Sequence, residues 1–398
     1  MELSSKEKIE KNIGKIWLIY FLDGLWFPLP VYVLYILDVG MNMTELGILM
    51  GLAAVFQFLL DIPSSILADK YSRKSVLVIA GVAYLLCDVA FLYANSFIFF
   101  IPAFVFWGIT TALMSGIVSA FTYDTMLSLG RERKYETIQA RIMRGLFFGR
   151  AIASLGGVFI YSSYPKAVFI FAIIVNLIMI ATILTLQEPP REKSISKSLR
   201  QVKEGFSFLL SNSRIWSIVI FFSLMVATCD TAFSYYQPVL RASGIDLLSI
   251  GIVYFGINIL SSLGSILYIR LRRKAGWRIT MAAYILIDLM TAIAFSTLST
   301  VPVLVSISLL SIAFGSQYVY MTNIIHKCVP SSHRATTLSV QGQIYMFFYA
   351  INMGIVGLAT DNGSLSDGMR LNALIVALLL CLFIYKLRDR RELAIEVN

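Results

Sequence analysis

Several ionisable residues, four of them candidates for chemistry, lie inside long apolar runs of this chain, where a charge is costly unless it is paired, hydrated or used in chemistry. Asp23, Asp61 and Asp230 are acids, and Arg150 is a cation. A carboxyl group in such surroundings can take up and release a proton near neutral pH. Arg150 needs a counter-ion, which Asp23, Asp61, Asp124 or an anionic substrate could supply. These residue types predict proton exchange or the binding of a charged solute within a membrane.

The elements that position these residues are apolar runs of membrane-spanning length. Of the 398 residues, 58% are hydrophobic and 14% are charged, whereas about 25% are charged in an average soluble protein. A run of about 20 apolar residues crosses a bilayer as a helix. The sequence predicts an all-α membrane protein with twelve such spans, at 16–37, 44–68, 75–94, 97–123, 142–163, 166–187, 215–239, 247–270, 278–299, 302–325, 336–359 and 370–387. Pro28 and Pro30 predict a break within the first span.

The basic residues indicate the orientation of these spans. Apart from Arg150, nearly all of the 33 Lys and Arg residues fall in segments on one side, and only Lys166, Arg241 and Arg370 fall on the other. Positively charged loops stay in the cytoplasm. We therefore expect both termini in the cytoplasm, and we expect localisation in the plasma membrane of a prokaryotic cell.

Composition and motifs exclude several function classes. The net charge of +10 follows the membrane orientation, so we do not expect nucleic-acid binding. No G-x-x-x-x-G-K-[ST], G-x-S-x-G or H-E-x-x-H motif occurs, and these are the marks of ATP-driven or hydrolytic chemistry. With four Cys, two His and no Cys/His cluster, a metal site is not expected. The sequence predicts neither an enzyme nor a bound cofactor.

A charged turn between the second and third runs carries the clearest motif. Residues 65–74 resemble the signature loop of the major facilitator superfamily, G-x-L-A-D-R-x-G-R-K. The five direct matches are Leu67, Ala68, Asp69, Arg73 and Lys74; Lys70 is a conservative replacement, and Ser65 and Ser72 stand in place of the two glycines. Before this loop, Asp61, Pro63 and Ser64 are similar to the family's usual lead-in.

The resemblance implies two six-helix halves that expose a central site to each side of the membrane in turn. We expect these halves at residues 1–187 and 215–398, joined by a cytoplasmic linker at 188–214. In the family, the loop Asp caps a helix end, and the loop Arg pairs with an acid at the end of the fourth span. The resemblance therefore assigns a gating role to Asp69, Lys70, Arg73, Lys74 and Asp124.

The two halves carry a weak internal repeat at an offset of 200 residues. Ser65-Ile66-Leu67 recurs as Ser265-Ile266-Leu267, and Asp88 recurs as Asp288. Two parallel six-helix halves are expected to leave such a trace. Because the family places these two acids on peripheral helices, we expect them to have structural roles.

The resemblance also implies a substrate site on the cavity-lining helices, where Asp23, Asp61, Arg150 and Asp230 are the candidates for proton coupling or substrate binding. Aromatic and amide side chains are further cavity candidates: Trp26, Gln57, Trp107, Tyr235, Tyr236 and Asn323. We expect a monomeric, proton-coupled exporter of small amphipathic compounds. Two alternatives stay open, namely a transporter of a specific, possibly anionic, metabolite, and a transport-inactive scaffold or sensor.

Overall fold

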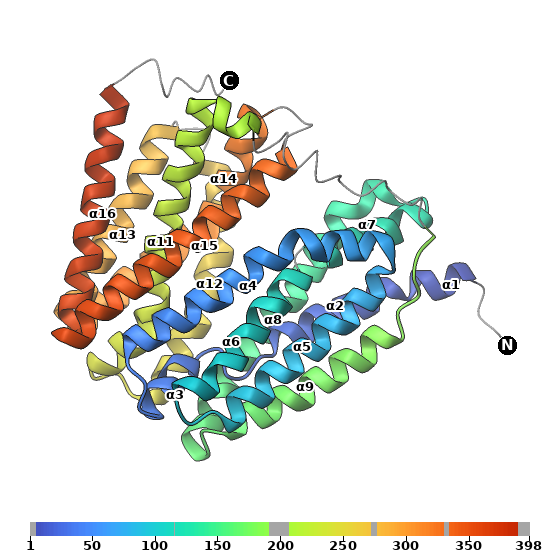
Figure 1. The fold of residues 1–398 in the computed structure, drawn as a ribbon, viewed down its shortest axis with the longest axis horizontal. Coiled ribbons are helices and arrows are strands. Elements are labelled where there is room, and N and C mark those ends of the chain that lie inside the picture. The colour runs from blue at the N-terminus through green and yellow to red at the C-terminus, as the bar shows by residue number, and fades with distance from the viewer. Residues whose placement is uncertain (1–4, 115, 191–206, 272–276, 330–333, 389–398) are drawn as a thin grey trace. The chain divides into compact units, whose positions relative to one another are not determined.

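A computed structural model of the chain describes residues 5–114, 116–190, 207–271, 277–329 and 334–388. These residues form helices and connecting turns (Figure 1). The helices of the first part are α1 (Ser5–Glu10), α2 (Asn12–Gly24), α3 (Tyr32–Asp38), α4 (Met43–Lys70), α5 (Arg73–Tyr93), α6 (Phe97–Met114), α7 (Ile117–Ser128), the short 3-10 helix η1 (Glu132–Lys134), α8 (Tyr135–Ser163) and α9 (Ala167–Leu184). The helices of the second part are α11 (Ser213–Ala242), α12 (Leu247–Leu271), α13 (Trp277–Thr297), α14 (Thr300–Cys328), α15 (Arg334–Asn362) and α16 (Leu365–Arg388).

The helices fall into two compact units. Unit 1 contains Met1–Tyr35 and Leu52–Lys197, and unit 2 contains Ile36–Gly51 and Ser198–Asn398. The beginning of α4 therefore belongs to unit 2, and its remainder belongs to unit 1. The division into 1–187, a linker at 188–214 and 215–398 stays a prediction.

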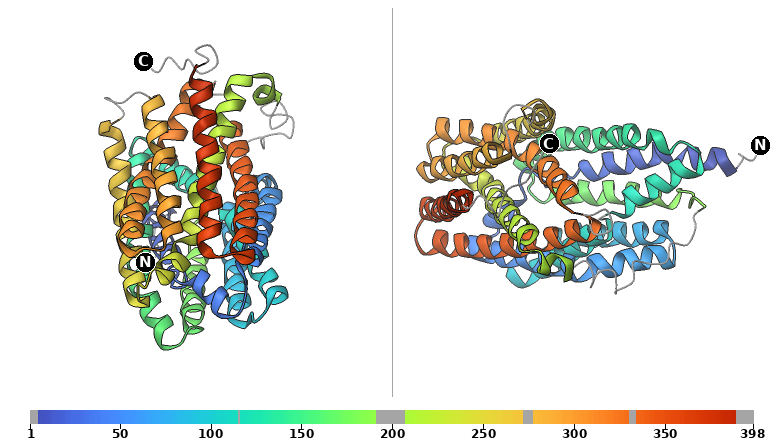
Figure 2. Two further views of the ribbon diagram at one scale, coloured as in Figure 1. Left: turned by 90° about the vertical axis from the view of Figure 1, so that its left-hand side faces the viewer. Right: turned by 90° about the horizontal axis from the view of Figure 1, so that it is seen from above.

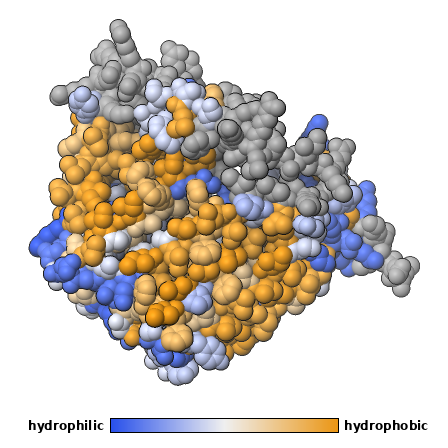
Figure 3. All heavy atoms as spheres, in the orientation of Figure 1, coloured by the Kyte–Doolittle hydropathy of each residue, from blue (hydrophilic) through white to orange (hydrophobic). Residues whose placement is uncertain are grey.

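Many of these helices are apolar on their outer faces as well as in their cores. In the described part of the chain, eleven spans are long and apolar enough to cross a membrane, and α6 and α7 together form one of them. Large apolar side chains such as Ile98 and Phe159 are 72% and 67% exposed, and hydrophobic residues dominate much of the face drawn in Figure 3. This is the surface that a lipid bilayer requires. The first predicted span, 16–37, is not among these eleven because it is divided between α2 and α3. Adding it gives twelve spans, the number that the sequence predicts.

The predicted break in the first span is confirmed. Helix α2 ends at Gly24 and α3 begins at Tyr32. The chain between them forms turns in which Trp26 O accepts from Leu29 N at 3.1 Å and Pro28 O accepts from Val31 N at 2.9 Å. Proline cannot donate a backbone hydrogen bond, which is why the helix stops here. The break leaves a short irregular segment within the span, and its residues are buried or half-buried.

The fourth predicted span contains a break that the sequence reasoning did not anticipate. Gly116 has φ +71°, in the left-handed region, and α7 begins immediately after it. Only glycine adopts this conformation without strain. The break separates α6 from α7, so the end that carries Asp124 is a helix of its own.

Unit 2 is built around α11, α13 and α14, and α13 packs against both α14 and α16 (Figure 2). Its core contains Phe222, Met225, Ile285 and Val376. The unit also holds the beginning of α4, where the Asp361 carboxylate of α15 accepts from the backbone N–H groups of Met43 and Thr44 at 3.1 and 2.7 Å. These N–H groups have no partner within their own helix. Asp361 thus adds to the cap that Asn42 provides, whose Oδ1 accepts from Glu45 N at 2.8 Å.

Candidate functional site

The charged turn between α4 and α5 is tight. Helix α4 ends at Lys70 and α5 begins at Arg73, so only Tyr71 and Ser72 connect them. Ser72 has an extended backbone (φ −163°, ψ 133°), and its hydroxyl accepts from Ser75 N at 3.2 Å as the N-cap of α5. Serine is among the best N-cap residues. The replacement of the second motif glycine therefore creates a cap, and this position does not need glycine's conformational freedom.

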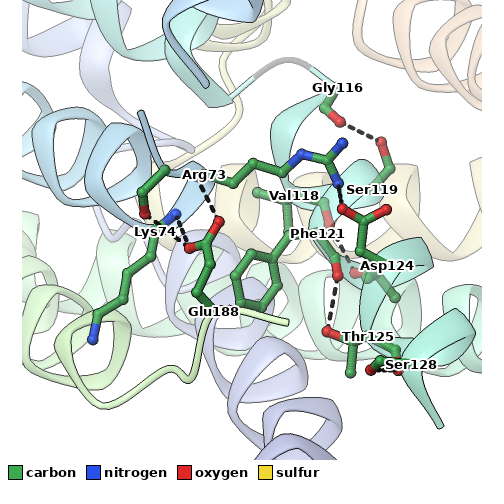
Figure 4. Close-up of polar contacts among 12 residues, drawn as sticks. Arg73, Lys74, Gly116, Val118, Ser119, Phe121, Asp124, Thr125, Ser128 and Glu188 are labelled. Carbon is green, nitrogen blue, oxygen red and sulfur yellow. Dashed lines mark hydrogen bonds and ion pairs between the residues drawn. The ribbon is translucent and has the colours of Figure 1, made fainter. Parts of the chain in front are cut away.

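Arg73 and Asp124 form an ion pair between α5 and α7, shown in Figure 4. Each side chain is 14% exposed. A charge-assisted hydrogen bond that is largely shielded from solvent is stronger than one at an open surface. The two residues that the motif singled out as partners are thus in contact, although their gating role stays a prediction. The side chains of Asp69 and Lys70 lie outside the described part of the structure.

Glu188, which follows the sixth span, contacts the same turn. Its carboxylate accepts from the backbone N–H groups of Arg73 and Lys74, each at 3.0 Å, and from the Ser72 hydroxyl at 2.8 Å (Figure 4). A carboxylate at a helix N-terminus is favoured by the helix dipole and by the free N–H groups there. The sequence analysis assigned Glu188 to the linker and gave it no role. The sequence contained one indication of this contact, namely that Glu188 directly follows the apolar run 166–187.

Asp23 and Arg150 interact electrostatically across the packing of α2 against α8. Both side chains are half-buried. Glycines allow the two helices to approach so closely, because a Cβ atom at Gly149 would lie 2.2 Å from Phe21 O and one at Gly24 would lie 2.1 Å from Leu146 O. Small residues at a membrane helix interface permit such backbone contact. Of the counter-ions considered for Arg150, Asp23 is thus present, whereas Asp124 is paired with Arg73.

Next to this pair, an aromatic cluster surrounds the break in the first span. Its members are Trp26, Tyr32, Tyr84 and Trp107. The ring centroids of Trp26 lie 5.2 Å from Trp107, 5.8 Å from Tyr32 and 6.4 Å from Tyr84. Trp26 is buried, while the other three rings are partly exposed. Tyr84 also interacts electrostatically with Asp23 and Arg150. Two predicted cavity residues, Trp26 and Trp107, therefore lie together beside the predicted charged residues.

Asp88 of α5 fixes the position of Trp26. Its side chain is fully buried, and one carboxylate oxygen accepts from the indole Nε1–H of Trp26 at 2.9 Å. The other oxygen accepts from the amide of Asn176 on α9. Both oxygens of this carboxylate therefore have an N–H donor. The sequence analysis expected a structural role for Asp88, but not its contact with a candidate site residue.

The remaining candidates are distributed over other elements. Asp230 of α11 accepts from the Tyr345 hydroxyl of α15. Tyr235 is fully buried, and Tyr236 is 4% exposed and stacks on Tyr254. Neither tyrosine is open to a solute in this conformation. Further candidates on α4, Gln57 and Asp61, are partly exposed, and the side chain of Asn323 lies outside the described residues.

Comparisons with known proteins place this fold in a family. A model of the "Major Facilitator Superfamily" matches residues 16–355. The "Uncharacterized MFS-type transporter YxaM" of Bacillus subtilis is 20% identical over 56% of this chain and 57% of its own length. The corresponding protein MJ1560 of Methanocaldococcus jannaschii is 20% identical over 90% of this chain and 92% of its own length.

Solved structures agree in fold. A mutant of the nucleoside transporter NupG matches with a TM-score of 0.82 at 16% identity, covering 94% of this chain and 99% of that protein. A D-xylose-proton symporter matches with a TM-score of 0.69 at 14% identity, covering 95% and 96%. Together with the signature turn and the two helical units, the family match shows that this chain belongs to the major facilitator superfamily of secondary transporters.

Proposed function

We propose that this transporter is a proton-coupled exporter of small amphipathic compounds that works by alternating access. The observation that carries the proposal is the half-buried Asp23, which interacts electrostatically with Arg150 and with Tyr84 of the aromatic cluster of unit 1. A carboxylate that is partly shielded from water and held next to a cation can change its protonation when either partner moves. Asp23 is therefore the proposed coupling group of unit 1.

The aromatic cluster supports an amphipathic substrate. Trp107, Tyr32 and Tyr84 are partly exposed residues, and each of their rings packs near the ring of buried Trp26. Aromatic faces attract apolar groups and organic cations, and a cation over such a face gains about 0.5–2 kcal/mol. An organic cation and a proton would compete for the same negative charge on Asp23. That competition is the physical basis of antiport.

The turn between α4 and α5 supplies the proposed gate, on the predicted cytoplasmic side. Arg73 pairs with Asp124, and Glu188 caps α5 through the backbone N–H groups of Arg73 and Lys74. Each contact is charge-assisted and each partner lies on a different segment of unit 1. We propose that these contacts hold one state of the transport cycle and are broken and remade in each turnover.

A second candidate function rests on Arg150. If the Asp23 carboxylate is neutralised by a proton, the guanidinium becomes free to bind an anionic group of a substrate. Arginine binds carboxylates and phosphates through two parallel hydrogen bonds. The alternative is therefore a transporter of a specific anionic metabolite, in which Arg150 holds the anion and Asp23 carries the proton.

Proton movement in inverted membrane vesicles tests both functions. The vesicle lumen is acidified, and lipophilic cations such as ethidium and organic acids are added in turn while lumenal pH is recorded. We expect cations to dissipate the gradient in wild type and not in Asp23→Asn. The exposed acid Glu132 provides a matched control, because Glu132→Gln removes a carboxylate that lies outside the membrane-spanning segments. A response to organic anions alone would replace the exporter proposal with the metabolite alternative, and no response to either class would support the scaffold.

A further inference from the structure

The acid that repeats Asp88 in the second half is held in a different way. Asp288 lies on α13 and, like Asp88, is fully buried. Each acid contacts the first span of its own half: Asp88 contacts Trp26, and Asp288 contacts Thr228 of α11. The repeat seen in the sequence is therefore also a repeat in structure. The two carboxyl groups differ in what their partners can donate.

Asp88 has the surroundings of a carboxylate. Two N–H groups, from Trp26 and Asn176, point at its two oxygens. Neither group can accept a hydrogen bond in return, because the indole nitrogen and the amide nitrogen are donors only. A proton on Asp88 would displace one of these donors. The site is thus built for the ionised form.

Asp288 has the surroundings of a carboxylic acid. Its Oδ2 lies 2.7 Å from the Thr228 hydroxyl, whose oxygen also lies 3.0 Å from the carbonyl of Met225. A hydroxyl carries one hydrogen but can also accept. If Asp288 is protonated, its O–H donates to Thr228 and the Thr228 hydroxyl donates to Met225 O. Asp288 Oδ1 has no hydrogen-bond partner among the described residues.

The ionised form would be much harder to accommodate at this position. A fully buried carboxylate would have a single hydroxyl donor, and a buried charge without paired donors is strongly destabilising. Among the described residues, the titratable groups that interact electrostatically with Asp288 are Cys229 and Asp230, both on α11. Neither is a cation. Helix α14 packs against α13 as well, where the Ser316 hydroxyl accepts from the Tyr284 hydroxyl of α13. The charged residues of α16 lie in its first two turns and in its last turn, at Asp367, Arg370, Lys386 and Arg388.

A donor for the ionised form is nevertheless present on the neighbouring helix. Gln317 of α14 is 2% exposed, and its amide makes one polar contact among the described residues, with the thiol of Cys229 on α11. Asp288 interacts electrostatically with the same thiol. A thiol is a weak hydrogen-bond partner, so the buried amide stays poorly satisfied. A rotation that brings the Gln317 N–H to Asp288 Oδ1 would exchange this weak contact for a carboxylate acceptor and would satisfy the oxygen of Asp288 that has no partner.

We propose that Asp288 is a proton-binding residue of unit 2, held as the acid by Thr228 and able to release its proton when Gln317 turns toward it. On release, the O–H bond of the acid breaks, the proton passes to water and the electron pair stays on the carboxylate. This inference rests on the proton coupling proposed above and adds a second site to Asp23. The contact between Gln317 of α14 and Asp288 of α13 would then form only when Asp288 is ionised, so the packing of these two helices would depend on the protonation state of Asp288.

Infrared spectroscopy tests the protonation state without any transport. The purified protein at neutral pH is compared with Asp288→Asn and Asp88→Asn in H₂O and D₂O. We expect the wild type to show the C=O band of a buried protonated carboxyl that Asp288→Asn lacks and Asp88→Asn retains. Persistence of the band in Asp288→Asn would overturn the inference. Thermal unfolding gives a second readout, because an asparagine amide can replace the acid O–H at Asp288 but would put an NH₂ group opposite one of the two donors at Asp88. Only Asp88→Asn is expected to lower the unfolding temperature.

Transport then tests the release of the proton. Ethidium-induced proton movement in vesicles is expected to fall at least tenfold in Asp288→Asn, while downhill ethidium efflux remains. We expect Gln317→Met to slow proton release in the same way and to leave the infrared band in place. Full proton movement in Asp288→Asn would refute the coupling role. A wild type that shows the acid band but no proton movement with any solute would refute the proposed function and the coupling role together, and would leave the acid form established.

Discussion

The close approach of α2 and α8 yields a prediction whose size follows from the geometry. In Gly149→Ala, the new Cβ atom would lie 2.2 Å from Phe21 O, whereas carbon and oxygen atoms in contact are ordinarily about 3.3 Å apart. The helices must therefore separate by about 1 Å. Overpacking of this kind costs about 1–3 kcal/mol. The same shift would move Asp23 away from Arg150.

Gly14→Ala on α2, the other helix of this pair, is the control. No heavy atom lies within 4 Å of a Cβ built at Gly14, and alanine in a helix interior gains about 0.5–1 kcal/mol over glycine. Thermal unfolding of the two variants in one detergent gives the comparison. We expect Gly149→Ala to unfold well below wild type and to lose proton movement, and Gly14→Ala to unfold at or above wild type. Equal stability of the two variants would refute the packing of α2 on α8.

The remaining predictions concern charged contacts. Glu188→Ala should destabilise the protein by about 0.5–2 kcal/mol, as loss of an N-cap does, measured by thermal unfolding; unchanged stability would contradict the cap. A double-mutant cycle of Arg73→Ala and Asp124→Ala should give a coupling energy of about 1 kcal/mol, and additive effects would mean that the pair is not formed. Asp361→Ala should make the amide hydrogens of Met43 and Thr44 exchange faster, whereas unchanged exchange would contradict the contact.

The spans could be predicted from the sequence because they depend on one-dimensional properties. Runs of apolar residues and the bias of Lys and Arg to one side determine where helices cross a bilayer. The break near Pro28 and Pro30 followed from the missing backbone donors of proline. By contrast, the break before α7 depends on the left-handed conformation of Gly116. A single glycine in an apolar run does not predict a break in a helix.

The partners of the site residues were harder to predict because they come from tertiary packing. The sequence singled out Arg73 with Asp124, and Asp23 as one of several partners for Arg150. It gave no sign that Asp88 would contact Trp26, since 62 residues separate them. Nor did it distinguish Asp88 from Asp288, because the difference lies in their neighbours: two N–H donors at one acid and a hydroxyl at the other.

The central claim is that proton movement is coupled to solute movement through Asp23. Its most direct test is lumenal pH in inverted vesicles that contain wild type, Asp23→Asn or Glu132→Gln, with ethidium added across a preformed gradient. The account predicts rapid dissipation in wild type and Glu132→Gln and none in Asp23→Asn. Dissipation that is equally fast in Asp23→Asn, or absent from all three proteins, would contradict it.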